Sequence, residues 1–399
     1  MVTATVIGGD PGRPDVDVTL DNWQSPAQLH WSFQHLAEIF PSATISRGRA
    51  PTWRFPTGPA DFGQLAVALP DGSHETVGGL LASTETDAWM VVHHGVVLAE
   101  EYPGMRPEGV HLLMSVSKSL VGSLVGILAD RRIIELDAPV THYAHGLADS
   151  GYAGATVRQV LDMRSGVRFS EHYLDPNAEV RRIEEAFGWA RRREPWVPEG
   201  LYPFLTTLHA DRPHGGGFRY RSCESDVLGW VCEAATGQRF GTLLSDLLWS
   251  PMGAAQDAVI GVDAFGTGMF DGGISASLGD LVRFGALWLN EGRTAAGVHV
   301  LPSWWVADTF AGGADSAEAF ATSLDATVMP GGMYRNQFWF PYPHRDVMLA
   351  LGIHGQMIYV NRRTGTVAAK LSSWPEPQSG WKLFRTLRAF DTIAHSLAH

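Results

Sequence analysis

Two side chains able to do nucleophilic chemistry stand three residues apart in the first third of the chain. Ser115 and Lys118 lie in MSVSKSLVGSLVG, where apolar residues recur at spacings of three and four, as in a helix. Residues three apart share a helix face, so the hydroxyl and the amine can meet. A lysine whose pKa is lowered by burial and by the helix N-terminus can accept the serine proton. The pair predicts an acylated Ser115 activated by Lys118, although Ser-x-x-Lys alone is a common pattern.

A tyrosine in a glycine-rich loop is the third candidate. Tyr220 stands in GGGFRYRSCESDVLGW, just before a predicted helix. In a Ser-x-x-Lys enzyme such a phenol can share the proton with the lysine and later protonate the leaving group. The alternative is a loop tyrosine that anchors its hydroxyl to the backbone.

The segment ALGIHGQMIYV predicts a strand that borders the cleft. We expect the backbone amides of Ile353 and Ser115 to form an oxyanion hole there, for which side-chain identity does not matter. His354 follows directly and could be taken for a general base. We prefer to interpret it as a packing or substrate-contact residue, as is usual for a strand histidine flanked by glycines.

The sequence does not support metal or cofactor chemistry. The clusters with metal-like spacing have neither the HExxH nor the HxHxDH form of a hydrolytic zinc site; they are His142, His145, His209, Asp211 and His214. No Gly-x-Ser-x-Gly elbow occurs either. We therefore predict no metal and no cofactor.

Composition limits the partners. The 399 residues are 45% hydrophobic, enough for a large core. They carry a net charge of −12 with no block of Lys and Arg. We therefore expect no nucleic acid partner, whereas a cationic substrate is compatible with the negative charge. No run reaches the roughly 18 apolar residues that cross a membrane. The opening residues lack signal-peptide features, and Cys223 and Cys232 are too few for a disulfide framework. We expect a cytoplasmic protein that could act as a homodimer.

The predicted elements are strands at both ends of the chain and helices between them. Residues 88–102 and 347–374 give β-rich runs around turns, whereas the stretches at 115–132, 225–249 and 278–292 have helical spacing. Residues 1–60 are predicted to be an arm around the body, and the last twenty residues a closing helix.

This order predicts an α/β (α+β) fold. Residues 1–140 and 290–399 should share one sheet, and residues 141–289 should form an inserted all-α domain. Ligand sites are common at interfaces between domains, so we expect the active site at the junction of the two domains.

Several motifs together resemble the class C β-lactamase-like family of penicillin-recognising serine hydrolases. MSVSKS, the Tyr-x-Ser loop followed by DVLGW, FDGGISAS, and GIHGQ ahead of KLSSWP occur in that family's order and approximate spacing over residues 85–385. They look especially like the members that hydrolyse nylon oligomers. The resemblance implies an antiparallel sheet flanked by helices, a helical insertion, Ser115, Lys118 and Tyr220 at their junction, and no metal or cofactor.

One departure from the family pattern narrows the substrate. The Lys-Thr-Gly triplet that helps hold the substrate carboxylate in β-lactam-handling members is replaced by Ala350-Leu351-Gly352 or by Gly352-Ile353-His354. Neither contains a lysine. We therefore expect weak β-lactam binding and place β-lactamase and D-Ala-D-Ala peptidase activity among the remote alternatives.

The resemblance also implies substrate contacts. Tyr173 in EHYLDP and Trp189 in FGWARRR match a substrate-covering segment, and Trp339 in NQFWF matches a pocket wall. Glu184 falls where an acid would suit a substrate ammonium group, and Asp271 where a neutral amide is expected. The alternative for both acids is an exposed helix or loop residue.

The sequence thus predicts a serine hydrolase of small linear amides with esterase side activity, acting through an acyl-enzyme on Ser115. The alternatives are a carboxylesterase for short-chain esters and a catalytically silent homologue that binds a ligand in the same cleft.

Overall fold

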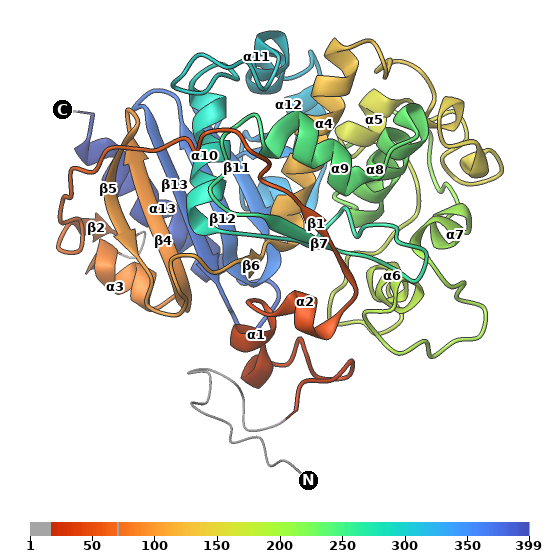
Figure 1. Ribbon diagram of the computed structural model, residues 1–399, viewed down its shortest axis with the longest axis horizontal. Coiled ribbons are helices and arrows are strands. Elements are labelled where there is room, and N and C mark those ends of the chain that lie inside the picture. The colour runs from red at the N-terminus through yellow and green to blue at the C-terminus, as the bar shows by residue number, and fades with distance from the viewer. Residues whose placement is uncertain (1–16, 70–71, 399) are drawn as a thin grey trace.

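The computed structural model describes residues 17–69 and 72–398, and the start of the predicted N-terminal arm lies outside them. A seven-stranded antiparallel sheet is central to the described chain (Figure 1). Its order is β5-β4-β13-β12-β11-β10-β9, so an early strand, β4, pairs with the last strand, β13. The two ends of the chain therefore share one sheet, as predicted. The strands are β4 Thr86–His93, β5 Val96–Glu101, β9 Met333–Arg335, β10 Phe338–Phe340, β11 Val347–Gly352, β12 Gln356–Asn361 and β13 Thr366–Ser372.

Both faces of this sheet are covered by helices, which explains its nearly continuous apolar sequence. Successive side chains of a strand point to opposite faces. In β12, Ile358 and Val360 join the cluster that includes α10, whereas Met357 and Tyr359 join the cluster that includes α13. Figure 1 shows α10 and α13 on opposite sides of the strands.

The remaining elements surround this centre. A second antiparallel sheet has the order β1-β7-β8-β6, and β2 pairs with β3. These strands are β1 Ser42–Ile45, β2 Ala66–Ala68, β3 His74–Thr76, β6 His111–Leu112, β7 Ala258–Gly261 and β8 Ile274–Ala276. The α-helices are α1 Pro26–Ser32, α2 Leu36–Ile39, α3 Val77–Ala82, α4 Ser117–Asp130, α5 Val157–Leu161, α6 Glu179–Phe187, α7 Leu201–Thr206, α8 Ser222–Thr236, α9 Phe240–Leu244, α10 Leu278–Leu289, α11 Ser303–Ala311, α12 Ser316–Ala321 and α13 Gly380–Ser396.

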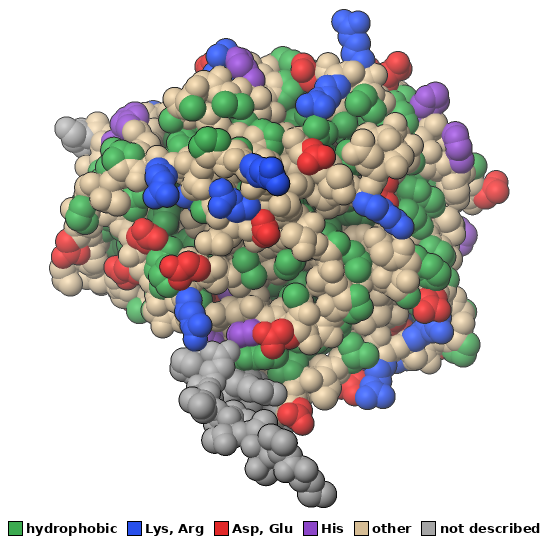
Figure 2. Space-filling model, viewed as in Figure 1, with side chains coloured by type: hydrophobic (Ala, Val, Ile, Leu, Met, Phe, Trp, Pro, Cys, Tyr) green, Lys and Arg blue, Asp and Glu red, His purple; other side chains and the backbone are tan. Residues whose placement is uncertain are grey.

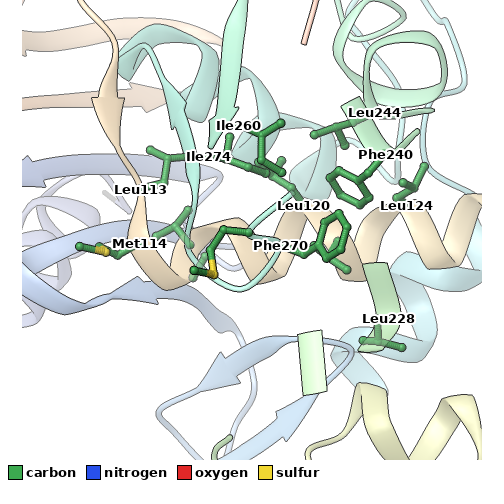
Figure 3. Close-up of a cluster of buried hydrophobic side chains, with 14 of the residues drawn as sticks. Leu113, Met114, Leu120, Leu124, Leu228, Phe240, Leu244, Ile260, Phe270 and Ile274 are labelled. Carbon is green, nitrogen blue, oxygen red and sulfur yellow. The ribbon is translucent and has the colours of Figure 1, made fainter. Parts of the chain in front are cut away.

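Helix α4 lies between the sheets and the helical part and is fixed by a mixed apolar cluster (Figure 3). Leu120 and Leu124 of α4 meet side chains from α8, α9, β7 and the turn before β8. Phe270 of that turn packs over Gly229 of α8, where any Cβ would collide with its ring. This packing fixes the turn, and with it the neighbouring Asp271, beside α4.

The helical part contains α5 to α9, and its expected end at residue 289 includes elements that pack with the sheets. Helix α10 packs against β13, β12 and β4 of the large sheet. Strands β7 and β8 pair with β1 and β6. We therefore propose that the helical part ends near residue 257, before β7, because β7, β8 and α10 pack with the sheets.

On the face seen in Figure 2, basic and acidic side chains are interspersed. Within the described residues, no helix has both the length and the apolar character needed to span a bilayer.

Candidate active site

Ser115 lies in a short 3₁₀ turn, η1 Met114–Val116, that leads directly into α4. The preceding Leu113 donates its N–H to the Ile274 carbonyl at 2.8 Å, which ties the turn to β8. Met114 adopts φ 47°, a left-handed conformation that is uncommon outside glycine and concentrates at functional turns. The serine is thus held at a sharp turn between a sheet and a helix N-terminus.

The helical spacing predicted from the sequence brings the two reactive groups together. Lys118 Nζ lies 2.9 Å from Ser115 Oγ and donates a second hydrogen bond, at 2.6 Å, to the Asp271 main-chain carbonyl. Its side chain is 1% exposed. Two acceptors fix the amine against the hydroxyl, which is the geometry needed for proton transfer.

The charge around Lys118 differs from the expectation. Burial lowers the pKa of Lys118, but the nearby Tyr220, Asp271, Glu171 and Asp226 outweigh burial and raise its pKa above the usual value. The Asp271 carboxylate lies 3.5 Å from Nζ. The lowered pKa that would make Lys118 a ready proton acceptor is therefore not found, because Tyr220 and three acidic residues from distant segments converge on the amine.

Tyr220 completes the group. Lys118 Nζ lies 5.4 Å from the centre of its ring, and the ring stacks on Trp339 at 5.1 Å. Burial raises the pKa of Tyr220 to about 12, although the Lys118 charge and a hydrogen bond with Ser115 oppose the rise. The next residue, the buried Arg221, bonds to Glu224 and to main-chain carbonyls near residue 165, and so anchors the loop.

The predicted oxyanion hole is supported by a close approach of backbones. At the end of β11, a Cβ on Gly352 would collide with the Leu113 carbonyl, so only glycine allows this strand end to touch the nucleophile turn. Ile353 follows in a second turn, η6 Ile353–Gly355, which packs on η1. Ser115 and Ile353 both line one cavity.

That cavity has a volume of 930 Å³ and contains most of the predicted aromatic contacts. Tyr173, Tyr220 and Trp339 line it together with Ser115. Tyr173 hydrogen-bonds to Glu171, and its main-chain carbonyl accepts from Arg181 at 2.8 Å. Leu351 and Gly352, from the segment that stands in place of the Lys-Thr-Gly triplet in the resemblance, also line the cavity.

Trp189 and Glu184 do not line the cavity, so their predicted contact roles are not supported. Trp189 is buried beside Phe40 and Trp23, and its carbonyl accepts from the Trp23 indole at 3.0 Å. It anchors the N-terminal arm. Glu184 forms an ion pair with Arg181 at 2.7 Å and accepts from Gln24 at 3.0 Å, so its charge is already used within the fold.

His354 and Asp271 do not line the cavity, so a substrate contact is not supported for either, and His354 has the packing role that was the other part of its prediction. His354 is buried, with its ring against Phe33 and its Nδ1 2.7 Å from the Trp374 carbonyl. Burial lowers the pKa of His354 to about 4, so it is neutral and packs rather than acting as a base. Asp271 is outside the cavity lining, and its charge raises the pKa of Lys118.

Two acidic groups were missed by the sequence reasoning. Glu171 lines the cavity and accepts a hydrogen bond from the Ser222 N–H at the start of α8. Asp226 is buried in α8 and accepts from the Asp271 N–H at 3.0 Å. Each acid stands in a motif quoted above, Glu171 in EHYLDP and Asp226 in SDVLGW. Neither motif indicates, however, that the two carboxylates face the Lys118 amine.

The described residues contain no group of three or more His, Cys, Asp or Glu side chains placed to hold a metal ion. The groups that converge at the cavity are instead a hydroxyl, an ammonium and a phenol. They can perform acyl transfer through a serine ester.

Comparison with known proteins agrees with this chemistry. The family profile described as Beta-lactamase matches residues 74–389. The chain therefore belongs to the β-lactamase family of serine hydrolases, as the sequence motifs predicted.

Its relatives include a named hydrolase. The chain is 40% identical over 374 residues to 6-aminohexanoate-dimer hydrolase from Paenarthrobacter ureafaciens, covering 92% of this chain and 91% of that protein. A solved structure from Bacillus anthracis assigned as a 6-aminohexanoate-dimer hydrolase matches with a TM-score of 0.86 and 26% identity, over 96% of this chain and 98% of that one. A family VIII carboxylesterase matches with a TM-score of 0.60 and 14% identity, over 79% and 96% of the two chains, which shows a shared fold.

Proposed function

We propose that this protein hydrolyses small linear amides of the 6-aminohexanoate-dimer kind, with short esters as side substrates. The observation that carries the proposal is the 2.9 Å contact between Ser115 Oγ and Lys118 Nζ beside a 930 Å³ cavity. A cavity of this size suits an extended small molecule. The 40% identity to a named dimer hydrolase supports an amide substrate.

Acylation begins when Ser115 Oγ attacks the amide carbonyl carbon. The serine proton passes to the Lys118–Tyr220 pair, and the amides of Ser115 and Ile353 hold the charge on the carbonyl oxygen. The C–N bond then breaks, the pair gives the proton to the leaving nitrogen, and the amine departs. The acyl group remains as an ester on Ser115.

Deacylation repeats these steps with water. Water attacks the ester carbonyl, the pair takes a proton from it, and cleavage of the C–O bond restores the Ser115 hydroxyl as the acid departs. Each oxyanion donor should lower the barrier by about 3 kcal/mol. The acid-base pair should contribute about 10²–10⁴-fold in rate.

A cationic group on the substrate is compatible with the cavity. Glu171, Glu179, Asp211 and Asp325 line it, and the whole chain carries a net charge of −12. We expect a higher KM for a substrate whose amine is acetylated than for the free amine. We also expect a cytoplasmic location and a homodimer, the latter measurable by sedimentation equilibrium.

A side-by-side panel tests the proposal. Purified protein is assayed on 6-aminohexanoate dimer, shorter ω-amino amides and p-nitrophenyl acetate and butyrate. Ser115→Ala should abolish turnover, whereas Ser396→Ala, at the exposed end of α13, should behave like the parent. Ester turnover with complete inertness towards amides would move the assignment to a carboxylesterase.

A covalent probe separates the enzyme from a silent homologue. A serine-directed fluorophosphonate should add its mass to the peptide that contains Ser115. An unmodified Ser115 together with tight ligand binding would overturn the acyl-enzyme mechanism.

A further inference from the structure

Three arginines from two separate segments line the active-site cavity. They are Arg168, just before the Tyr173 segment, and Arg212 and Arg219, in the loop before α8. Their side chains are 74%, 40% and 45% exposed, respectively. Cations at this position are unexpected in a chain with a net charge of −12.

Within the described residues, two of the three make no side-chain hydrogen bond. Arg212 Nε donates to Asp211 at 2.9 Å. By contrast, the contact of Arg168 with Glu179 is 3.9 Å and that of Arg219 with Asp211 is 3.8 Å, both too long for a hydrogen bond. Across the part of the chain that the structure describes, neither side chain has another ion pair. Their planar donors are therefore available to the cavity.

The backbones that carry these two arginines are fixed. The Arg168 N–H donates to the His209 carbonyl at 2.8 Å, and the Arg219 N–H to the Met163 carbonyl at 3.1 Å. Burial and the neighbouring Arg212 charge lower the pKa of Arg219, which indicates that positive charges are crowded at this edge. An anion placed here would relieve that crowding.

The position of Arg219 relates it to the leaving group. It is adjacent to Tyr220, which returns the proton to the leaving nitrogen in the proposed mechanism, and consecutive Cα atoms are about 3.8 Å apart. The leaving half of 6-aminohexanoate dimer ends in a carboxylate, separated from the nitrogen by an alkyl chain of roughly 7 Å, about two extended residues. Guanidinium groups bind carboxylates through paired hydrogen bonds.

We propose that Arg219, assisted by Arg168, binds the terminal carboxylate of the leaving-group half of the substrate. This subsite rests on the proposed function, since it assumes that Tyr220 marks the leaving-group side. It favours one orientation of an unsymmetrical substrate, with its carboxylate end towards the arginines.

Binding to an inactive variant tests the subsite without turnover. In the Ser115→Ala protein, calorimetric titration compares N-butanoyl-6-aminohexanoate with its uncharged primary carboxamide. Adding Arg219→Gln should weaken binding of the acid at least tenfold relative to the carboxamide, and Arg168→Gln should do so by about threefold. Arg219→Lys, which keeps the charge, should retain part of the preference.

Arg239→Gln is the matched control, because Arg239 is exposed, pairs with Glu233 and lies outside the cavity lining. It should leave the acid-to-carboxamide ratio unchanged. An equal affinity of the parent protein for both compounds, or an equal loss for both in Arg219→Gln, would overturn the subsite.

Kinetic measurements on the active protein distinguish a failure of the carboxylate subsite from a failure of the proposed function. The substrates are the butanoyl ester of 6-hydroxyhexanoate and the same ester with its carboxylate capped as an amide. A preference for the charged ester that resides in KM and disappears in Arg219→Gln supports the subsite. Ser115-dependent hydrolysis without that preference overturns the subsite alone, whereas hydrolysis that does not depend on Ser115 overturns the proposed function.

Discussion

Replacing Asp271 by Asn should move the pH dependence of the reaction to lower pH. The Asp271 carboxylate lies 3.5 Å from Lys118 Nζ, and its charge raises the pKa of both Lys118 and Tyr220. The Asp271 carbonyl also holds the amine at 2.6 Å. Since this main-chain bond survives the substitution, the variant changes the charge with little change in geometry.

The size of the effect follows from the distance. Two unit charges 3.5 Å apart attract by about 5 kcal/mol at an effective dielectric constant of about 20. Reorganisation of water and of Asp226 compensates for part of the lost attraction, so we expect the pKa of the Lys118–Tyr220 pair to fall by about 1–3 units. The sign is the same for either proton acceptor: loss of the anion destabilises the Lys118 ammonium and also makes the Tyr220 phenolate easier to form.

The assay is kcat/KM for p-nitrophenyl butyrate from pH 5 to 9.5. Both profiles should rise with pH across this range, and the rising limb of Asp271→Asn should lie about 1–3 units lower in pH than that of the parent. Asp246→Asn, on an exposed side chain of the helical part, should reproduce the parental profile, and thermal unfolding of both variants checks the fold. A rising limb that stays within 0.3 units (about a third of the smallest expected shift) in Asp271→Asn would refute the electrostatic argument.

Three further predictions concern neighbouring features. Gly352→Ala should lower kcat at least about tenfold in steady-state assays, because the new methyl group collides with the Leu113 carbonyl and displaces an oxyanion donor. Burial lowers the pKa of Lys370 to about 7 from 10.5. Between these two pH values the unfolded state binds more protons than the folded state, so the free energy of unfolding should rise with pH. Lys370→Met should flatten that rise, measured by urea titrations at pH 7, 8.5 and 10. The pKa of His354 is lowered from 6.5 to about 4, so the unfolding free energy should fall by about 3 kcal/mol as pH drops through this window, and His354→Gln should reduce the slope.

The parts of the fold and site that could be predicted are those set by local spacing or by motif order. Ser115 and Lys118 meet because a helix places residues three apart on one face, and β-rich runs on either side of a turn, as at Gly95, define strands from short stretches. That both chain ends share one sheet followed from the strands at both ends of the chain, but the pairing of β4 with β13 is specified only by long-range contacts. Tyr220 could be predicted because several motifs occur together in one order.

The residues that were misplaced depend on partners far away in sequence. Trp189 follows Gly188, whose left-handed φ of 95° turns the chain inwards, but its packing partners Trp23 and Phe40 come from the N-terminal arm. Glu184 pairs with Arg181, one helical turn away, yet Gln24 of the same arm completes its contacts. No local pattern specifies such long-range contacts, and a position in a family motif does not indicate which way its side chain points.

The raised pKa values at the site favour one half of the chemistry over the other. A Lys118–Tyr220 pair that holds its protons tightly is a poor acceptor for the Ser115 proton at neutral pH, so attack is limited by the small fraction of the deprotonated pair. The same pair is a reliable acid when an amine must leave. Amides need that proton more than esters do, since an alkoxide leaves far more easily than an amide anion. The acidic residues that converge on Lys118 therefore bias the site towards amide cleavage, at the cost of a rate that rises with pH.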